Sequence, residues 1–182
     1  MAATGALPGL FFCFSAMLLL IFVSVSSPTW NSISFLNADR YAFGVFGYTG
    51  SKVQVGYYFP LPGDINTGIL HSLTFVLILY PIAAGLSGLA FLFGVCGAGY
   101  HRAGTVFMTL LAGLATLCTL VAWIISMSLF GTVRNRLRSE GINANWGNAN
   151  WLALGALVAL LLGSCTAACG IFGHYRDRRS RR

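Results

Sequence analysis

The stretch "YAFGVFGYTG", residues 41–50, stands between long apolar runs and combines aromatic residues with glycines. It is too short and too broken to cross a membrane, because a spanning helix needs about 20 predominantly apolar residues. It is also more apolar than a connection that lies free in water. We therefore expect a folded loop that packs against the ends of neighbouring helices.

Four apolar windows accompany this loop and predict membrane helices. Hydrophobic residues make up 57% of the 182 residues and charged residues 8%, whereas a soluble domain carries about 25% charged residues. The windows cover residues 7–25, 68–99, 104–131 and 151–172. Each should be helical, because a backbone in lipid must satisfy its own hydrogen bonds. Pro81 removes one backbone donor inside the second window and predicts a kink there.

The first window has a second interpretation, which is a cleaved signal peptide. Signal peptides normally begin with a positive charge, and none precedes Arg40 in this sequence. We therefore favour a retained helix, and with it an all-α membrane protein built as a four-helix bundle.

The loop between the first two windows, residues 27–67, contains nine aromatic residues and three stretches with strand character. "KVQVGYYF" (52–59) alternates, as a half-buried strand does. "YAFGVFGY" (41–48) and "TWNSISFL" (29–36) suit two further strands, and "TGSK" (49–52) reads as a turn. We predict a small three-stranded antiparallel sheet that leans on the helix bundle, because isolated hairpins are only marginally stable.

Positive charge near the membrane sets orientation, and here it is divided almost evenly. With four crossings, six basic residues share a side with the two termini and five lie opposite. The compact tail "RDRRSRR", residues 176–182, favours cytosolic termini. Each arginine near an anionic leaflet contributes roughly 1 kcal/mol, and phosphorylation of Ser180 would weaken that contact. The tail residues predicted to contact lipid headgroups are Arg176, Arg178, Arg179, Arg181 and Arg182.

Two further arginines lie in the connection between the third and fourth windows. Arg134 and Arg138 are four residues apart, so they share a helix face if the third helix continues past the membrane. They would form a basic patch for lipid headgroups or an acidic partner, or they would simply anchor the helix at the interface. We favour the anchor.

Small residues recur every fourth position along the fourth window, at Gly155, Ala159, Gly163 and Ala167. Such a row lets two helix backbones approach closely, which is how helices pair in lipid. The sequence leaves open whether the row contacts a sibling helix or a second copy of the chain.

The first loop resembles that of claudin-like four-helix membrane proteins, in which a Trp is followed by Gly-Leu-Trp-x-x-Cys and a second Cys. Here Trp30 is followed by "GVFGYT", residues 44–49, with Thr49 at the place of the first cysteine. All five cysteines lie in apolar stretches, and Cys96, Cys165 and Cys169 are close enough to helix ends to leave acylation open. The loop disulfide of that family cannot form, so aromatic packing would have to replace it.

The closer resemblance is to the fungal PalI family, which includes the pH-response regulator PalI and its eisosome-associated relatives. Its loop typically reads Phe-Gly-x-x-Gly-Tyr-Cys, and "FGVFGYT" (43–49) follows that pattern up to the last letter. "RNRLRSEGINANWGNANWLALGAL" (134–157) resembles the family's approach to the fourth helix, with Gly147, Ala149 and Trp151 in place. The short tail departs from many PalI proteins, whose tails are long, so partners of such tails do not carry over.

This resemblance implies a plasma-membrane scaffold or regulator that assists an ambient-pH signalling complex or organises a membrane subdomain. Its partners would be membrane lipids and other integral membrane proteins, either a sensor or a cortical scaffold. In the loop, the candidates for partner contact or for holding the loop fold are Trp30, Phe43, Gly44, Phe46, Gly47 and Tyr48. The alternatives are a claudin-like adhesion or barrier protein and, less favoured, a transporter or channel subunit.

The sequence gives no support for an enzyme. Four carboxylates and three histidines are too few and too scattered for a catalytic set, and no group of converging metal ligands is visible. We expect no cofactor and no metal. The scattered positive charge does not indicate nucleic-acid binding. The windows also contain almost no ionisable residues, which transporters and channels usually keep at membrane depth; His71 lies only at the mouth of the second window.

Overall fold

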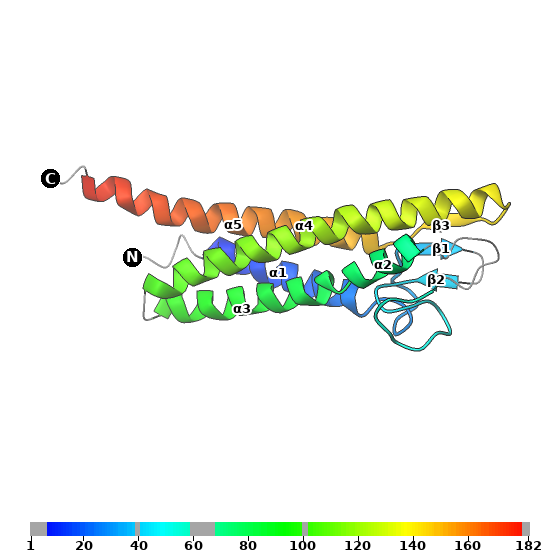
Figure 1. The fold of residues 1–182 in the computed structure, drawn as a ribbon. Helices are drawn as coiled ribbons and strands as arrows, with labels where there is room; N and C mark the ends of the chain where they lie inside the picture. The colour runs from blue at the N-terminus through cyan, green and yellow to red at the C-terminus, as the bar shows by residue number, and fades with distance from the viewer. Residues whose placement is uncertain (1–6, 39–40, 59–67, 100–101, 180–182) are drawn as a thin grey trace.

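The computed structural model describes residues 7–38, 41–58, 68–99 and 102–179. The four long helices pack side by side in alternating directions (Figure 1). The first long helix begins and the last one ends at the same end of the bundle, which we call the termini end. A small sheet lies at the opposite end, which we call the sheet end. The elements in chain order are α1 (Leu7–Ser24), β1 (Leu36–Ala38), β2 (Tyr41–Phe43), α2 (Gly68–Val76), α3 (Leu79–Gly99), α4 (Arg102–Ser139), β3 (Ala144–Trp146) and α5 (Ala149–Arg179).

Pro81 divides the second apolar window into α2 and α3. Proline has no N–H to donate to the carbonyl of Leu77, four residues earlier. The backbone forms a tighter, 3₁₀-type turn here, in which the Tyr80 N–H donates to the carbonyl of Leu77, three residues earlier, over 3.1 Å. The predicted kink is therefore confirmed as a break between two helices.

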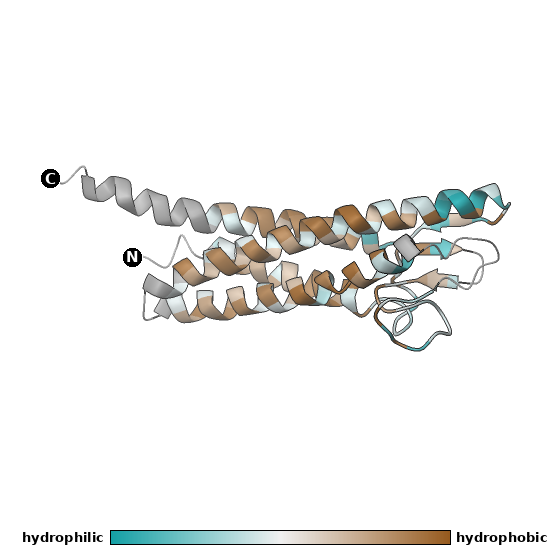
Figure 2. Cartoon of the chain, viewed as in Figure 1, coloured by the Kyte–Doolittle hydropathy of each residue, from teal (hydrophilic) through white to brown (hydrophobic). Residues whose placement is uncertain are grey.

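Within the described ranges, three helical stretches are long and apolar enough to cross a membrane: His71–Gly97, Val106–Ser139 and Ala149–Thr166. α1 is a shorter apolar helix. The exposed apolar side chains of α4, which we call the apolar belt, begin at Val106 and end at Met127. At 1.5 Å per residue they cover about 33 Å, close to the roughly 30 Å of a bilayer's hydrocarbon core. Beyond Met127 the exposed face of α4 turns polar, as the teal end of the helix shows (Figure 2).

The sheet has three antiparallel strands in the order β2-β1-β3. In the register of the two ladders, Leu36 lies opposite both Phe43 and Trp146. A three-stranded antiparallel sheet was predicted, but the sheet in the structure is built from different segments of the chain. The third strand comes from the connection between α4 and α5. Residues 52–58 form no strand, so the prediction of a strand over 52–59 was wrong for the part that the structure describes.

The chain at 52–58 leaves the sheet for two reasons. Gly56 has a φ of 69°, a left-handed conformation that breaks an extended strand. The ring of Phe75 from α2 lies against Gly56, where any Cβ would overlap it. Val53 and Val55 are consequently exposed while Tyr57 is buried, so these residues do not share the one face that their alternation predicted.

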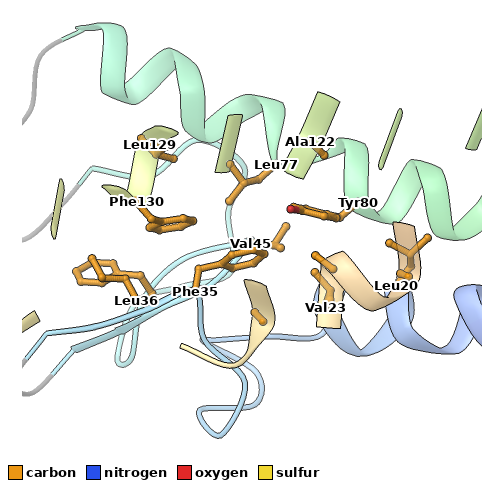
Figure 3. Close-up of a cluster of buried hydrophobic side chains, with 14 of the residues drawn as sticks. Leu20, Val23, Phe35, Leu36, Val45, Leu77, Tyr80, Ala122, Leu129 and Phe130 are labelled. Carbon is orange, nitrogen blue, oxygen red and sulfur yellow. The ribbon is translucent and has the colours of Figure 1, made fainter. Parts of the chain in front are cut away.

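The sheet is attached to the bundle by a buried cluster of apolar side chains (Figure 3). Phe35, just before β1, stacks on Phe130 of α4 with ring centroids 5.1 Å apart and planes 9° apart. It also contacts Tyr80 of α3 at 5.5 Å, and the Tyr80 hydroxyl is hydrogen bonded to Ser126 over 2.8 Å. Sheet and helices therefore share one core, to which Leu20, Val23, Leu36, Val45, Leu77, Ala122 and Leu129 also belong.

The row of small residues on α5 faces α1. A Cβ at Gly163 would lie 3.3 Å from Phe12 Cβ and 3.5 Å from Cys13 Sγ. A Cβ at Gly155 would lie 3.7 Å from Leu19, and Ala159 packs against the core. The side chain of Ala167 lies outside the described set. In the structure, the partner of the row is thus a helix of the same chain.

This contact predicts that Gly163→Leu lowers the free energy of unfolding by about 1–3 kcal/mol, because a larger side chain must push α1 away. The measurement is thermal unfolding of the detergent-solubilised protein. Gly113→Leu is the matched control, since a Cβ at Gly113 in α4 meets no atom within 4 Å. Equal losses in the two variants would show that α1 does not press on Gly163.

Candidate functional site

The motif "FGVFGYT" forms a tight turn that closes onto the chain after α1. The Gly44 N–H donates to the Gly47 carbonyl over 2.8 Å. The Val45 N–H donates to Ser26 Oγ over 3.0 Å. A Cβ at Gly44 would overlap the backbone of Ser27, so only glycine fits. The motif therefore fixes the loop to the end of α1.

Thr49 stands where the resembling families carry a cysteine, and it makes hydrogen bonds in place of a disulfide. Its Oγ accepts the Ala42 N–H over 3.2 Å and donates to Asn31 Oδ1 over 3.3 Å. Tyr48 meanwhile packs against the rings of Tyr41, Phe43 and Tyr57, with centroids 5.6–6.3 Å apart. The loop is thus closed by ring contacts, as the absence of loop cysteines led us to expect, and also by hydrogen bonds of Thr49, which were not expected.

The second motif, around Gly147, docks onto the same part of the loop. The Gly147 N–H donates to the Phe35 carbonyl over 2.9 Å, and the Ala149 N–H donates to the Ser34 carbonyl over 3.0 Å. The Phe35 N–H donates to the Phe43 carbonyl over 2.7 Å. Two motifs that lie about 100 residues apart in sequence therefore meet on the backbone of residues 34–35.

The loop residues were predicted either to contact a partner or to hold the loop fold, and in the structure most of them lie inside the loop. Phe43, Gly44 and Gly47 are buried, whereas Phe46 and Tyr48 are half-buried. Trp30 is 51% exposed, and its ring lies 6.3 Å from that of Phe22 on α1. Of these candidates, Trp30 alone offers a largely exposed side chain.

Three further large apolar side chains are exposed in the loop segment 51–58, and the sequence did not indicate them. They follow the tight turn and, together with Trp30, we call them the loop surface: Trp30, Val53, Val55 and Tyr58. Gln54, between the two valines, is held by a 3.0 Å bond from its N–H to the Phe46 carbonyl. The ring of Tyr58 stacks on His71 of α2, with centroids 4.2 Å apart. The loop surface is thus tied to the turn and to α2.

The arginines of α4 support the third strand. α4 continues past its exposed apolar side chains, so Arg134 and Arg138 both lie on this helix, as the sequence suggested. The Arg134 guanidinium lies 5.6 Å from the ring centroid of Trp146, and Arg138 Nε donates to the Ala144 carbonyl over 3.2 Å. Both contacts fasten β3 to the end of α4. The side chains of Arg176, Arg178 and Arg179 and all of residues 180–182, including Ser180, Arg181 and Arg182, lie outside the described set.

Burial raises the pKa of the Tyr57 phenol above its ordinary value, because the phenolate would lose its water. The neutral hydroxyl donates to the Gly44 carbonyl over 3.0 Å. Because the folded-state pKa is the higher one, this contribution to stability is complete below about pH 10 and declines above it. Tyr57 therefore titrates too high to report moderate alkalinity, and it serves the fold.

Within the part of the chain that the structure describes, no three His, Cys, Asp or Glu side chains are grouped to hold a metal ion. The model of the SUR7/PalI family matches residues 6–165 of the chain, which confirms the resemblance noted in the loop motifs. A search of the curated proteins found no match.

Proposed function

Because the chain belongs to the SUR7/PalI family, we propose that it is a plasma-membrane scaffold or regulatory protein of the PalI type. In this role it assists an ambient-pH signalling complex or organises a membrane subdomain, and it binds other integral membrane proteins. It is not an enzyme in this proposal, and it does not itself sense pH. The protein stabilises or positions a partner.

The proposal includes a membrane arrangement. α1, α3, α4 and α5 cross the bilayer in a claudin-like order, with both termini in the cytosol and the sheet end outside. Support comes from the exposed apolar side chains of α4, whose length matches a bilayer core, and from the start of α1 and the end of α5, which lie at the same end of the bundle (Figure 1). The basic tail then lies on the inner leaflet.

One observation carries the proposal, namely the loop surface. Val53 is 63% exposed and Tyr58 is 59% exposed, and both belong to the sheet end, beyond the apolar belt. Exposed apolar side chains of this kind contribute most to the free energy of binding when a second protein covers them. The segment is also held in place by the turn and by α2, so a partner would not have to order it on binding.

We expect Val53→Asp to reduce capture of a partner membrane protein by at least about tenfold, since a charge in an apolar contact costs more than about 1.4 kcal/mol. The measurement is affinity capture of tagged full-length protein in mild detergent, followed by mass spectrometry that compares wild type and variant. Gln54→Asp is the matched control, because it places the same charge on the adjacent exposed residue.

The identity of the captured protein separates the two branches of the proposal. A sensor of ambient pH supports the signalling role, and a cortical scaffold protein supports the subdomain role. Deletion should then impair growth at alkaline pH or under membrane stress and displace that partner from the cell surface. Equal capture by both variants, together with normal growth of the deletion strain, would contradict the proposal. Pairing only between opposed membranes would point to adhesion instead.

A further inference from the structure

A cleft of about 280 Å³ opens between α4 and α5, where the apolar belt ends near the sheet. No lining residue is charged. Three tryptophans and two aliphatic side chains make its walls, and one amide side chain lies among them. The lining residues are Trp123, Met127, Trp146, Asn150, Trp151 and Leu154.

Two buried polar atoms in this lining have no hydrogen-bond partner: the indole Nε1 of Trp123, a donor, and Oδ1 of Asn150, an acceptor. Asn150 is only 4% exposed. Its Nδ2 donates to the Phe35 carbonyl over 3.2 Å, which fixes the orientation of the amide. A buried polar atom without a partner costs about 1–3 kcal/mol. The lining residues therefore hold one buried donor and one buried acceptor that no protein group satisfies.

We propose that this cleft binds the hydroxyl end of a sterol from the surrounding leaflet. A hydroxyl carries both the acceptor that the Trp123 N–H lacks and the donor that Asn150 Oδ1 lacks, whereas the oxygens of a phosphodiester headgroup only accept. The flat ring system lies against the tryptophan walls. The cleft is slightly smaller than a typical enclosed ligand pocket of about 300–1,000 Å³, so it holds the polar end and the rest stays in lipid.

The position of the cleft suits this ligand. Met127 is the last exposed apolar residue on α4, and a sterol hydroxyl lies at the same boundary between hydrocarbon and headgroups. Trp151 is 71% exposed, so the lining of the cleft reaches the outer face of the bundle. In this proposal its side chain shifts on binding and admits the hydroxyl to the two buried atoms. The Arg134 guanidinium steadies the opposite wall through the ring of Trp146.

The test is photolabelling of the purified full-length protein by a cholesterol analogue that carries a diazirine and a free 3β-hydroxyl. We expect the label on α4 and α5 around the cleft, displaced by cholesterol. Cholesteryl methyl ether cannot donate, so it should displace the label at least about threefold to tenfold less well, which is the range for one hydrogen bond. Trp123→Phe, which removes the N–H, should weaken binding by a similar factor.

Leu154→Trp should fill the cleft and reduce labelling at least about fivefold. Leu161→Trp is the matched control, two turns along the same face of α5 and 46% exposed to lipid. Unfolding temperatures of all variants establish that they fold. Equal labelling of Leu154→Trp and Leu161→Trp would overturn the proposal. So would equal competition by the ether, or stronger competition by a phospholipid or a ceramide.

Discussion

Replacing Gly147 by alanine should lower the free energy of unfolding by more than about 3 kcal/mol. The added Cβ would overlap the backbone carbonyl of Ser34. Neither segment can yield, because the Gly147 N–H is bonded to the Phe35 carbonyl and the Ala149 N–H to the Ser34 carbonyl. Overlap with backbone that is held on both sides is among the mechanisms that give unusually large losses. Thermal unfolding in detergent or nanodiscs should show a transition lowered by roughly 6 °C or more.

Gly85→Ala is the control for this prediction. A Cβ at Gly85, in the middle of α3, meets no atom within 4 Å. The same substitution there should leave stability unchanged or raise it by about 0.5–1 kcal/mol, because alanine is the better helix former. If Gly147→Ala lowers the free energy of unfolding and Gly85→Ala does not, the loss of stability comes from the contact between the Gly147 motif and the loop. A neutral Gly147→Ala would mean that the connection after α4 does not dock on residues 34–35.

The helical part of this fold could be predicted because its cause is local. Apolar windows of sufficient length are visible in any single sequence, and so is Pro81, whose missing N–H interrupts the helix at Leu77. The small residues of α5 were also visible. Their partner was not, because spacing along one helix does not say which neighbour fills the groove.

The composition of the sheet could not be predicted, because it depends on contacts between distant segments. The alternation in residues 52–59 is a strand pattern, but Phe75 from α2 lies on Gly56 and turns the chain away. β3 is only three residues long and has no strand pattern of its own. It pairs with β1 because α4 extends beyond its exposed apolar side chains and Arg138 Nε donates a hydrogen bond to the Ala144 carbonyl.

The same reason explains why the loop surface and the cleft were missed. Val53 and Val55 were predicted to face inward with Tyr57, and only the position of α2 shows that they face outward. Tryptophans such as Trp146 and Trp151 are common at membrane interfaces in general, so their presence does not by itself indicate a cleft. The signal for the cleft was Asn150, a polar residue at the start of an apolar helix, and it gains meaning only when Trp123 is placed beside it.

Phe35→Ala should destabilise the protein by about 3–5 kcal/mol, the usual cost of removing a large buried aromatic side chain. Phe35 is fully buried, and its ring contacts those of Phe130 and Tyr80. It precedes β1, and its backbone joins Phe43 to Gly147. The substitution therefore leaves a cavity where the sheet meets the bundle and loosens both motifs together. Hydrogen exchange should show lost protection in the loop peptides from 29–43 before any change in α5.

Phe11→Ala is the matched control, because the Phe11 side chain is 66% exposed on α1 and leaves no cavity when shortened. It should change the unfolding temperature by less than 2 °C or so, a shift that corresponds to roughly 0.5 kcal/mol. Phe35→Leu should recover about half of the loss, because leucine fills much of the space without the ring contact. If Phe35→Ala exposed the loop to exchange but left the bundle's unfolding temperature unaltered, sheet and bundle would be separate cooperative units, and the loop surface would not be held by the helices.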